Sequence, residues 1–458
     1  MSFSPTDSSH RSQSPALLRT VLATLATRFA MLPLGLLQGA LLARGLGPEG
    51  LGRYSATLVD VNIVTTVLAL GIPGGLAVLV GESQGQASAT RQLWWFGVRH
   101  TLLALLLAGL VGIGIGLLYP ALPHRIEAYH TPLISTLLLL CVIGQLGRDL
   151  HNALLWGGQR FSAQNRLGLL LSIAQLGAVV VLFVIGELVV PSALLLQALS
   201  LWGLCLAFGW RLKTWLSQQT ESSLGTPKSV NSPSLLHLYK VSLRNFFHIL
   251  PDMLLLRIDV YLIELLLPKQ SMEHDLGLYQ AGVRVAELLL MLPGTLNAVL
   301  FAKAAAREDV ADKALWSAKL CLYLGLLGCL GMLVIGKPLL VLFYGQRFAG
   351  SFVPCLLVLL GCTALSFSGP LAGTLSGASG YPTSVIVAQT TALLTNVGLN
   401  LWLLPRYGIT GAALASTGAY TVSAMCISIG FARHFRIPLR KLLVPVGPRE
   451  LWSRLSPR

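Results

Sequence analysis

Residues 167–186 read LGLLLSIAQLGAVVVLFVIG, a run of twenty residues without a charged side chain. A helix of roughly 20 apolar residues is long enough to cross the hydrocarbon core of a bilayer. Eleven further windows of this kind lie along the chain, and together the twelve place about 240 residues in lipid. The runs are continuous rather than alternating, which excludes a transmembrane β-barrel. The sequence therefore predicts an all-α, polytopic membrane protein.

The composition excludes a soluble globular enzyme. Of 458 residues, 54% are hydrophobic and only 11% are charged, with a mean hydropathy of +0.70, whereas soluble domains carry about 25% charged residues. The net charge of +15 would suggest nucleic acid in a soluble protein, but here the charges concentrate in loops between spans. The seven cysteines fall in or beside apolar runs without a C-x-x-C pair, so we expect small core residues rather than disulfides or metal ligands.

The Lys and Arg residues orient the chain in the membrane. The predicted spans are 17–43, 54–80, 97–118, 132–154, 166–186, 189–209, 243–267, 278–302, 314–335, 352–375, 382–404 and 410–432. With the N-terminus inside, 23 of the 33 Lys and Arg residues lie in inner segments, 7 in outer segments and 3 within spans. Because inner loops carry the excess of Lys and Arg, both termini are predicted to be cytoplasmic.

The chain divides into two predicted lobes of six spans each. A polar, low-complexity stretch at 217–235 (SQQTESSLGTPKSVNSPSL) is typical of a flexible linker. The predicted parts are a disordered cytoplasmic tail (1–16), an N-lobe (17–210), a cytoplasmic linker (211–240), a C-lobe (241–432) and a basic cytoplasmic tail (433–458).

An internal repeat supports this division. The pattern L-G-x-Y-x-A occurs at 51–56 and again at 276–281, an offset of 225 residues, at the start of the second helix in each lobe. Six is an even number of spans, so the two lobes share an orientation. This is the parallel-repeat plan of transporters that alternate about a central cavity. A common helix-entry pattern is the alternative explanation.

Ionisable residues inside spans are the candidate site. Such groups cost at least about 2.5–3.5 kcal/mol to insert, so they normally face a cavity or a partner. Arg28, Arg257 and Arg284 are the three buried cations, and an arginine fork matches phosphate oxygens. We interpret them as a cationic cavity that binds an anionic head group. The candidates to relay protons or balance charge are Asp60, Asp259 and Glu287.

A purely structural role is the alternative for each arginine. Arg284 and Glu287 are three residues apart and can pair within their own helix, while Arg28 has no acid in its own span. Weaker polar candidates, among them Gln389, Asn396 and Asn400, either line a hydrophilic path or form interhelical hydrogen bonds.

Enzyme motifs are accidental matches. Gly45–Gly50 fits G-x-G-x-x-G but follows a membrane helix, so we expect a turn between spans. Residues 331–337 (GMLVIGK) resemble a P-loop, yet Pro338 stands where Ser or Thr is needed. The nine histidines have no metal-ligand spacing. We therefore predict no catalytic residues and no metal site.

Four segments resemble one family. Residues 41–54 (LLARGLGPEGLGRY), 257–263 (RIDVYLI), 277–287 (GLYQAGVRVAE) and 405–413 (PRYGITGAA) are similar to the polysaccharide biosynthesis proteins, the Wzx-type flippases of lipid-linked oligosaccharides. The resemblance implies two six-helix lobes around a cationic cavity. It places the chain in the multidrug/oligosaccharidyl-lipid/polysaccharide (MOP) superfamily, with multidrug exporters and lipid II flippases. Lipid II flippases usually have fourteen spans, whereas twelve are predicted here.

The resulting hypothesis is a non-enzymatic flippase in the bacterial inner membrane. By alternating access it would carry undecaprenyl-diphosphate-linked oligosaccharide across the bilayer for O-antigen, capsule or exopolysaccharide. It would need no cofactor, with H⁺ or Na⁺ as candidate coupling ions, and a polysaccharide polymerase and chain-length machinery as candidate protein partners; no nucleic acid is expected. The alternatives are a cation-coupled multidrug exporter, a lipid II flippase-like protein, and a membrane glycan polymerase or ligase. The last would need a large outer loop, which the sequence lacks.

Overall fold

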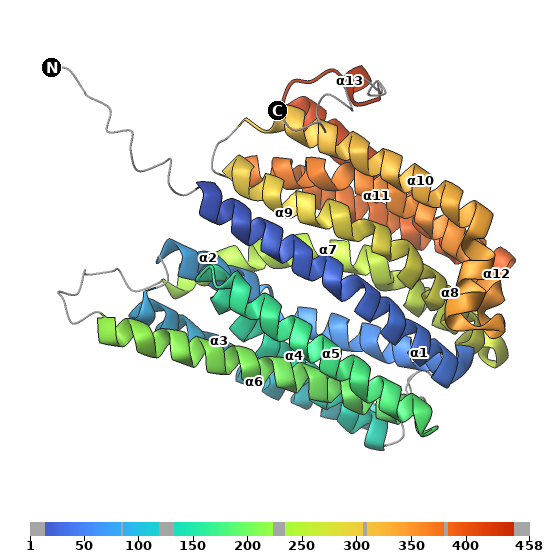
Figure 1. Cartoon of the computed structure of the whole chain (residues 1–458), viewed down its shortest axis with the longest axis horizontal. Coiled ribbons are helices and arrows are strands. Elements are labelled where there is room, and N and C mark those ends of the chain that lie inside the picture. Colours follow the sequence, from blue (N-terminus) through green and yellow to red (C-terminus); the bar gives the residue numbers. More distant parts are fainter. Residues whose placement is uncertain are drawn as a thin grey trace. The chain divides into compact units, whose positions relative to one another are not determined.

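The structure is a computed structural model that describes residues 14–83, 86–118, 132–222, 234–305, 309–379 and 383–443. These residues form helices joined by short connections, and none of them lies in a strand (Figure 1). Eight of the described helices are long and apolar enough to cross a membrane. The predicted all-α polytopic fold is confirmed.

The helices follow one another in chain order. In the first part they are α1 (Ser14–Ala69), α2 (Ile72–Glu82), α3 (Ala87–Leu118), α4 (Pro132–Gly157), α5 (Phe161–Val184) and α6 (Val190–Ser222). In the second part they are α7 (Leu235–Leu266), α8 (Lys269–Glu287), the 3-10 turn η3 (Leu288–Leu290), α9 (Met291–Ala305), α10 (Ala311–Tyr344), η4 (Gln346–Ser351), α11 (Phe352–Ser379), α12 (Thr383–His434) and α13 (Leu439–Leu443).

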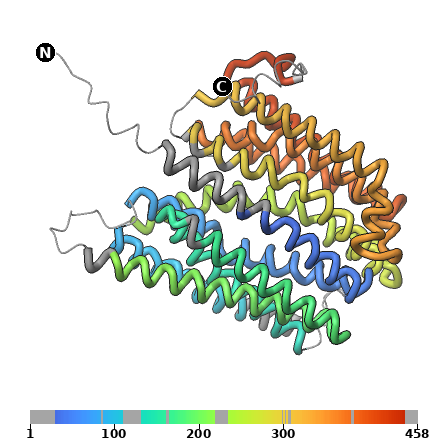
Figure 2. Tube along the Cα trace, in the orientation of Figure 1, coloured from blue at the N-terminus to red at the C-terminus, as the bar shows by residue number. Residues whose placement is uncertain are grey.

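Two of these helices run through a bent glycine between predicted spans: α12 covers the last two spans, and α1 covers the first span and the beginning of the second, which continues into α2. Gly47 in α1 (φ 68°, ψ 178°) and Gly408 in α12 (φ 56°, ψ −144°) interrupt the helical backbone. Gly47 is followed by Pro48, which suits the first turn of a helix and disfavours the helical conformation in the residue before it. The turn predicted over Gly45–Gly50 is therefore a bend at one residue. Figure 2 traces α1 as two helical runs joined at a bend.

The helices also change the predicted linker. Residue 211 lies within α6, which continues to Ser222, and α7 already begins at Leu235. Most of the predicted 211–240 linker is thus helical, and residues 223–233 lie outside the described part. Residues 1–13 of the predicted N-terminal tail and 444–458 of the C-terminal tail lie outside it as well.

The chain forms two compact units that do not strictly follow chain order. The first comprises Met1–Gly45 and Asp60–Phe246, and the second comprises Leu46–Val59 and Phe247–Arg458. The short segment Leu46–Val59 therefore packs with the second unit, and the first turns of α7 pack with the first. This assignment places Ser55 beside residues of α8, which matters for the site described below.

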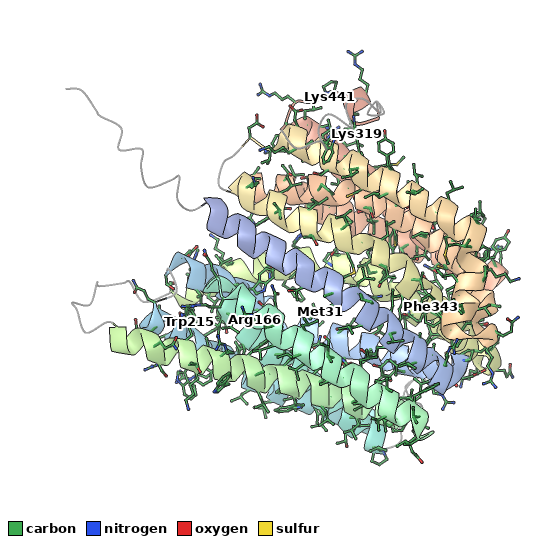
Figure 3. All side chains as sticks on the ribbon, in the orientation of Figure 1. Met31, Arg166, Trp215, Lys319, Phe343 and Lys441 are labelled. Atoms are coloured by element: carbon green, nitrogen blue, oxygen red, sulfur yellow. The ribbon has the colours of Figure 1, made fainter. Side chains whose placement is uncertain are left out.

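Each unit is built around one central helix. In the first unit α4 packs against α2, α3, α5 and α6, and its buried Leu150 and Leu154 belong to the main apolar cluster. In the second, α11 packs against α8, α9, α10 and α12, with Leu371 and Phe431 in the core. Large apolar side chains are nevertheless exposed along the outer helix faces (Figure 3). Exposure of this extent suits a helix surface that faces lipid.

The two copies of the sequence repeat pack against each other in the second unit. A Cβ atom added to Gly52 would lie 2.2 Å from the Glu273 carbonyl oxygen, and one added to Gly277 would lie 1.8 Å from the Pro48 carbonyl oxygen. Both contacts obey the 225-residue offset, since 48 and 52 in one repeat correspond to 273 and 277 in the other. Two equivalent glycines thus let two helices approach at backbone distance, as small residues do in membrane helix packing.

Candidate functional site

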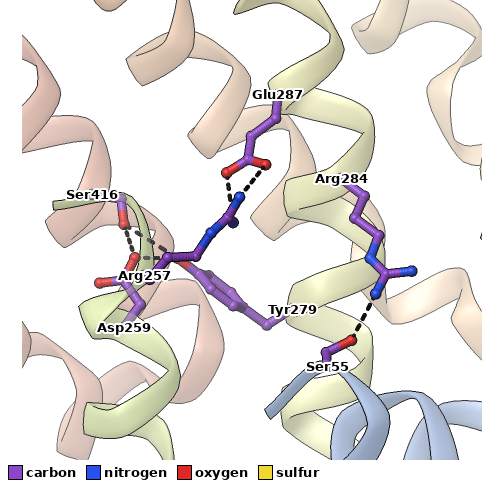
Figure 4. Close-up of polar contacts among 7 residues, drawn as sticks. All are labelled: Ser55, Arg257, Asp259, Tyr279, Arg284, Glu287 and Ser416. Atoms are coloured by element: carbon purple, nitrogen blue, oxygen red, sulfur yellow. Dashed lines mark hydrogen bonds and ion pairs between the residues drawn. The ribbon is translucent and has the colours of Figure 1, made fainter. Parts of the chain in front are cut away.

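The ionisable side chains of α7 and α8 form separate clusters in the second unit (Figure 4). In the first, both terminal guanidinium nitrogens of Arg257 donate to the carboxylate of Glu287, over 2.9 Å (Nη1 to Oε1) and 3.1 Å (Nη2 to Oε2). The two side chains are 28% and 20% exposed. This is the bidentate geometry that makes an arginine–carboxylate pair strong and directional.

The second cluster surrounds Arg284. Its Nη2 donates to the hydroxyl of Ser55 over 3.0 Å, and its guanidinium carbon lies 5.9 Å from the ring centre of Tyr54. Both partners are neutral, and no carboxylate of the described residues lies within ion-pair distance of Arg284. The pairing of Arg284 with Glu287 within α8, left open by the sequence, is not formed because Glu287 binds Arg257 instead.

The third cluster is centred on Asp259, which is only 2% exposed. Its Oδ2 accepts hydrogen bonds from the hydroxyls of Tyr279, over 2.6 Å, and Ser416, and its Oδ1 accepts one from the Asn400 amide over 2.8 Å. The Asn400 amide also donates to Asn396 Oδ1 over 2.8 Å. Helices α7 and α8 therefore converge on one buried carboxyl group, together with both arms of α12, which are the helical runs before and after Gly408.

Within the described part of the chain, the Asp259 carboxyl group has hydrogen-bond partners but forms no ion pair. Among the ion pairs of the described residues, none involves Asp259. Two atoms in the cluster, Asn396 Nδ2 and Asn400 Oδ1, are buried without a hydrogen-bond partner in the described structure. An ionised carboxylate buried without a countercharge is costly. The cluster is therefore chemically suited to take up a proton or a small cation, for which carboxylate, amide and hydroxyl oxygens are suitable ligands.

The remaining candidates lie on α1 in the first unit. Arg28 is in the first arm of α1, but its side chain lies outside the described part of the structure. Asp60 is partly exposed, and its neighbour Asn62 accepts a hydrogen bond from the Gln145 amide over 2.9 Å. Within the described residues, no group of three or more His, Cys, Asp and Glu side chains is placed to hold a metal ion.

Sequence reasoning missed two members of the Asp259 cluster. Tyr279 was part of the L-G-x-Y-x-A repeat, but nothing in the repeat indicated that its hydroxyl binds a carboxylate. Ser416 lies among small residues of α12 and carried no signal at all. The sequence marks Asn396 and Asn400 only as polar residues within a span. The usable signal is their helical spacing, since Asn396 follows Gln389 by seven residues and precedes Asn400 by four.

Solved structures with the same fold are transporters and flippases. The lipid II flippase MurJ in its inward closed conformation aligns over 93% of this chain and 89% of its own, with a TM-score of 0.63 and 15% identity. An inward-facing multidrug resistance MATE family transporter of the MOP superfamily aligns over 92% and 99%, at 0.64 and 16% identity. A MATE in the straight conformation aligns over 93% and 96%, at 0.65 and 16% identity. No family model and no curated protein sequence matches the chain. At these identities the likeness shows the fold alone.

Proposed function

We propose that this chain, which has the fold of membrane transporters and flippases, is a flippase for polyprenyl-diphosphate-linked oligosaccharides. The observation that supports this proposal is Arg284. Its guanidinium lies in a predicted span, and its partners among the described residues are a hydroxyl and an aromatic ring, because the nearby Glu287 is bound to Arg257. A cation held in lipid without a local carboxylate is expected to face an anionic ligand, and a diphosphate matches the arginine fork.

The other two arginines have distinct proposed roles. The Arg257 guanidinium is bound by Glu287, so it can bind a phosphate only by sharing its hydrogen bonds with Glu287 or by leaving that pair. Arg28, whose side chain lies outside the described residues, remains a candidate from the sequence alone for binding the anionic head group. In this proposal the diphosphate and sugar enter the cationic cavity while the polyprenyl chain stays in the bilayer.

In this proposal, the Asp259 cluster binds the ion that couples transport to an ion gradient. A proton or Na⁺ would neutralise the buried carboxyl group, with Tyr279, Ser416 and Asn400 as its hydrogen-bonding neighbours. Its release would leave a buried unpaired charge, and this penalty would shift the conformational equilibrium during transport. Asp60 and Glu287 remain secondary candidates for charge balance.

The proposed setting is the bacterial inner membrane with both termini in the cytoplasm. Transport would deliver the oligosaccharide for O-antigen, capsule or exopolysaccharide assembly, with a polymerase and chain-length machinery as candidate protein partners. These assignments follow the distribution of Lys and Arg and the sequence resemblance.

The test is to delete the gene and determine on which side of the membrane the undecaprenyl-linked oligosaccharide accumulates. We expect accumulation on the cytoplasmic side, restored by the intact chain but not by Arg284→Ala. The same variant in liposomes should slow flipping of a labelled diphosphate-linked oligosaccharide about tenfold or more, because a charge-assisted bond to phosphate is lost. Arg284→Lys, which keeps the charge but loses the fork, should be intermediate.

The matched control is Arg406→Ala, which removes an exposed arginine bound to the Trp402 carbonyl oxygen. It should leave flipping unchanged. Normal polymer and no lipid-linked intermediate in the deletion strain, combined with altered drug sensitivity in a pump-deficient host, would instead establish the multidrug exporter. Flipping that is unaffected by Arg284→Ala would refute the cationic-cavity proposal.

A further inference from the structure

A second polar layer lies beside the Asp259 cluster in the same unit. Gln389 in the first arm of α12 donates from Nε2 to Asp252 Oδ1 over 2.8 Å. Ser423 in the second arm donates its hydroxyl to Gln389 Oε1 over 2.9 Å. The layer therefore joins a carboxylate, an amide and a hydroxyl from α7 and from both arms of α12.

The two layers have the same register on all three helical segments. Asp252 precedes Asp259 by seven residues on α7, Gln389 precedes Asn396 by seven, and Ser416 precedes Ser423 by seven. Seven residues are close to two helical turns, so equivalent side chains lie on one helix face about 10.5 Å apart. The Asp252 layer repeats the chemistry of the Asp259 layer at a second depth along the same helices.

The layers differ in access. Asp252 is exposed, whereas Gln389 and Ser423 are buried, and so are Asn396 and Asp259. On the turn between them the two arms of α12 carry the small buried residues Ala392 and Ala419, while α7 carries the buried Leu255. The polar groups therefore run from an accessible carboxylate into the buried cluster, with an apolar turn separating two distinct positions.

We infer that Asp252, Gln389 and Ser423 form a second binding position for the coupled monovalent cation, a proton or Na⁺, through which it exchanges between solvent and Asp259. The inference rests on the coupling part of the proposed function. Asp252 supplies the charge, and Gln389, held by Ser423, orients its carboxylate. In the predicted orientation α7 begins in the cytoplasm, so this position serves exchange with the cytoplasmic side.

Exchange kinetics separate this role from that of a hydrogen bond that merely joins helices. The full chain is purified and reconstituted, and equilibrium binding and exchange of ²²Na⁺ are measured, with a pH-sensitive dye for protons. Asp259→Asn should abolish high-affinity binding. Asp252→Asn should slow exchange about tenfold or more, while affinity at Asp259 changes less than about threefold, since only the accessible position has lost its charge. Asp252→Glu should restore the rate.

The controls keep the outcomes distinct. Asp312→Asn removes an exposed carboxylate of α10 and should alter neither quantity. Ser423→Ala, which leaves the charge in place, should slow exchange less than Asp252→Asn and covers the case in which that variant does not fold. Exchange at the wild-type rate in folded Asp252→Asn overturns this inference and leaves coupling at Asp259 intact. If the wild type binds neither Na⁺ nor protons, this inference and the proposed coupling at Asp259 are both wrong. The flipping assay still tests the proposed substrate independently.

Discussion

The Arg257–Glu287 pair illustrates how much one contact depends on its surroundings. Both side chains are largely buried and joined by two hydrogen bonds. Removing one partner of such a pair leaves the other as an uncompensated charge, which costs more than the intact pair contributes. The pair therefore fixes α7 against α8 and also keeps Glu287 from neutralising Arg284.

A double-mutant cycle measures this dependence. Arg257→Ala and Glu287→Ala should each lower the apparent melting temperature in detergent, and the double variant should be more stable than the sum of the two losses predicts. We expect a coupling energy of about 1–3 kcal/mol. The comparison pair is Lys441–Asp312, with a 3.2 Å contact but side chains 54% and 75% exposed (Lys441 is labelled in Figure 3). Exposed pairs typically couple by about 0.2–1 kcal/mol. Equal coupling in both cycles would contradict the argument from burial.

At the scale of elements, the contact between the two sequence repeats depends on the absence of a side chain. A Cβ atom on Gly277 would clash with the Pro48 carbonyl oxygen, and a Cβ atom on Gly52 would clash with the Glu273 carbonyl oxygen. Backbone atoms cannot turn aside as a flexible side chain can. Two polar contacts flank the crossing: the Arg53–Glu273 ion pair at 2.7 Å and a hydrogen bond between His274 Nδ1 and Glu49 Oε1 at 2.8 Å.

Gly277→Ala should therefore force α8 away from the Leu46–Val59 segment. We expect a loss of about 1–3 kcal/mol, as for overpacking in a core, visible as a lower apparent melting temperature. Gly328→Ala in α10 is the matched control, since nothing lies within 4 Å of its added Cβ atom. That substitution should be neutral or stabilising by up to about 1 kcal/mol through helix propensity. A stable Gly277→Ala variant would show that the crossing tolerates separation.

The bend in α12 makes an independent prediction about backbone conformation. Gly408 has φ 56°, a region that residues with a Cβ atom adopt only at a cost of roughly 1–2 kcal/mol. Gly408→Ala should lower the apparent melting temperature accordingly. Gly398→Ala, in the same helix and with open space around the added Cβ atom, should not. Identical melting of the two variants would mean that the bend is not set by this glycine.

At the scale of the whole molecule, the long apolar runs were sufficient to predict the helical fold because a membrane span must satisfy its own backbone hydrogen bonds. Splitting α1 and α12 at their bends turns the eight span-forming helices into ten segments, and the 32-residue helices α3 and α7 lie at the other two predicted positions. The extension of α6 beyond residue 210 was missed. There Leu212 and Trp215 pack into the core of the first unit, so packing rather than hydropathy sets the end of that helix.

The site was less predictable than the fold. Charged residues in spans were easy to find because they are rare there, and Arg257, Asp259, Arg284 and Glu287 all belong to polar clusters. Their partners were not predictable from the sequence. Whether Glu287 pairs with Arg284 on its own helix or with Arg257 on α7 depends on how the two helices pack. Hydroxyl partners such as Ser55 and Ser416 have no distinctive pattern in a chain rich in small residues.

Under the proposed function, the orientation of the whole molecule decides the direction of transport, because the same fold inserted the other way would move the substrate in the opposite sense. The excess of Lys and Arg predicts that Lys441 lies in the cytoplasm and that Arg406 lies outside. Both side chains are exposed, so a cysteine at either position can be reached by a reagent, whereas six native cysteines are buried.

The labelling experiment uses a parent chain in which the partly exposed Cys426 is changed to Ser. An impermeant maleimide added to whole cells with a permeabilised outer membrane should label Arg406→Cys. It should label Lys441→Cys at least about tenfold less until the inner membrane is also permeabilised, because an apolar core excludes a charged reagent. The parent without either added cysteine sets the background. The reverse pattern would place both termini outside and would rule out export of a cytoplasmically assembled oligosaccharide by the proposed route.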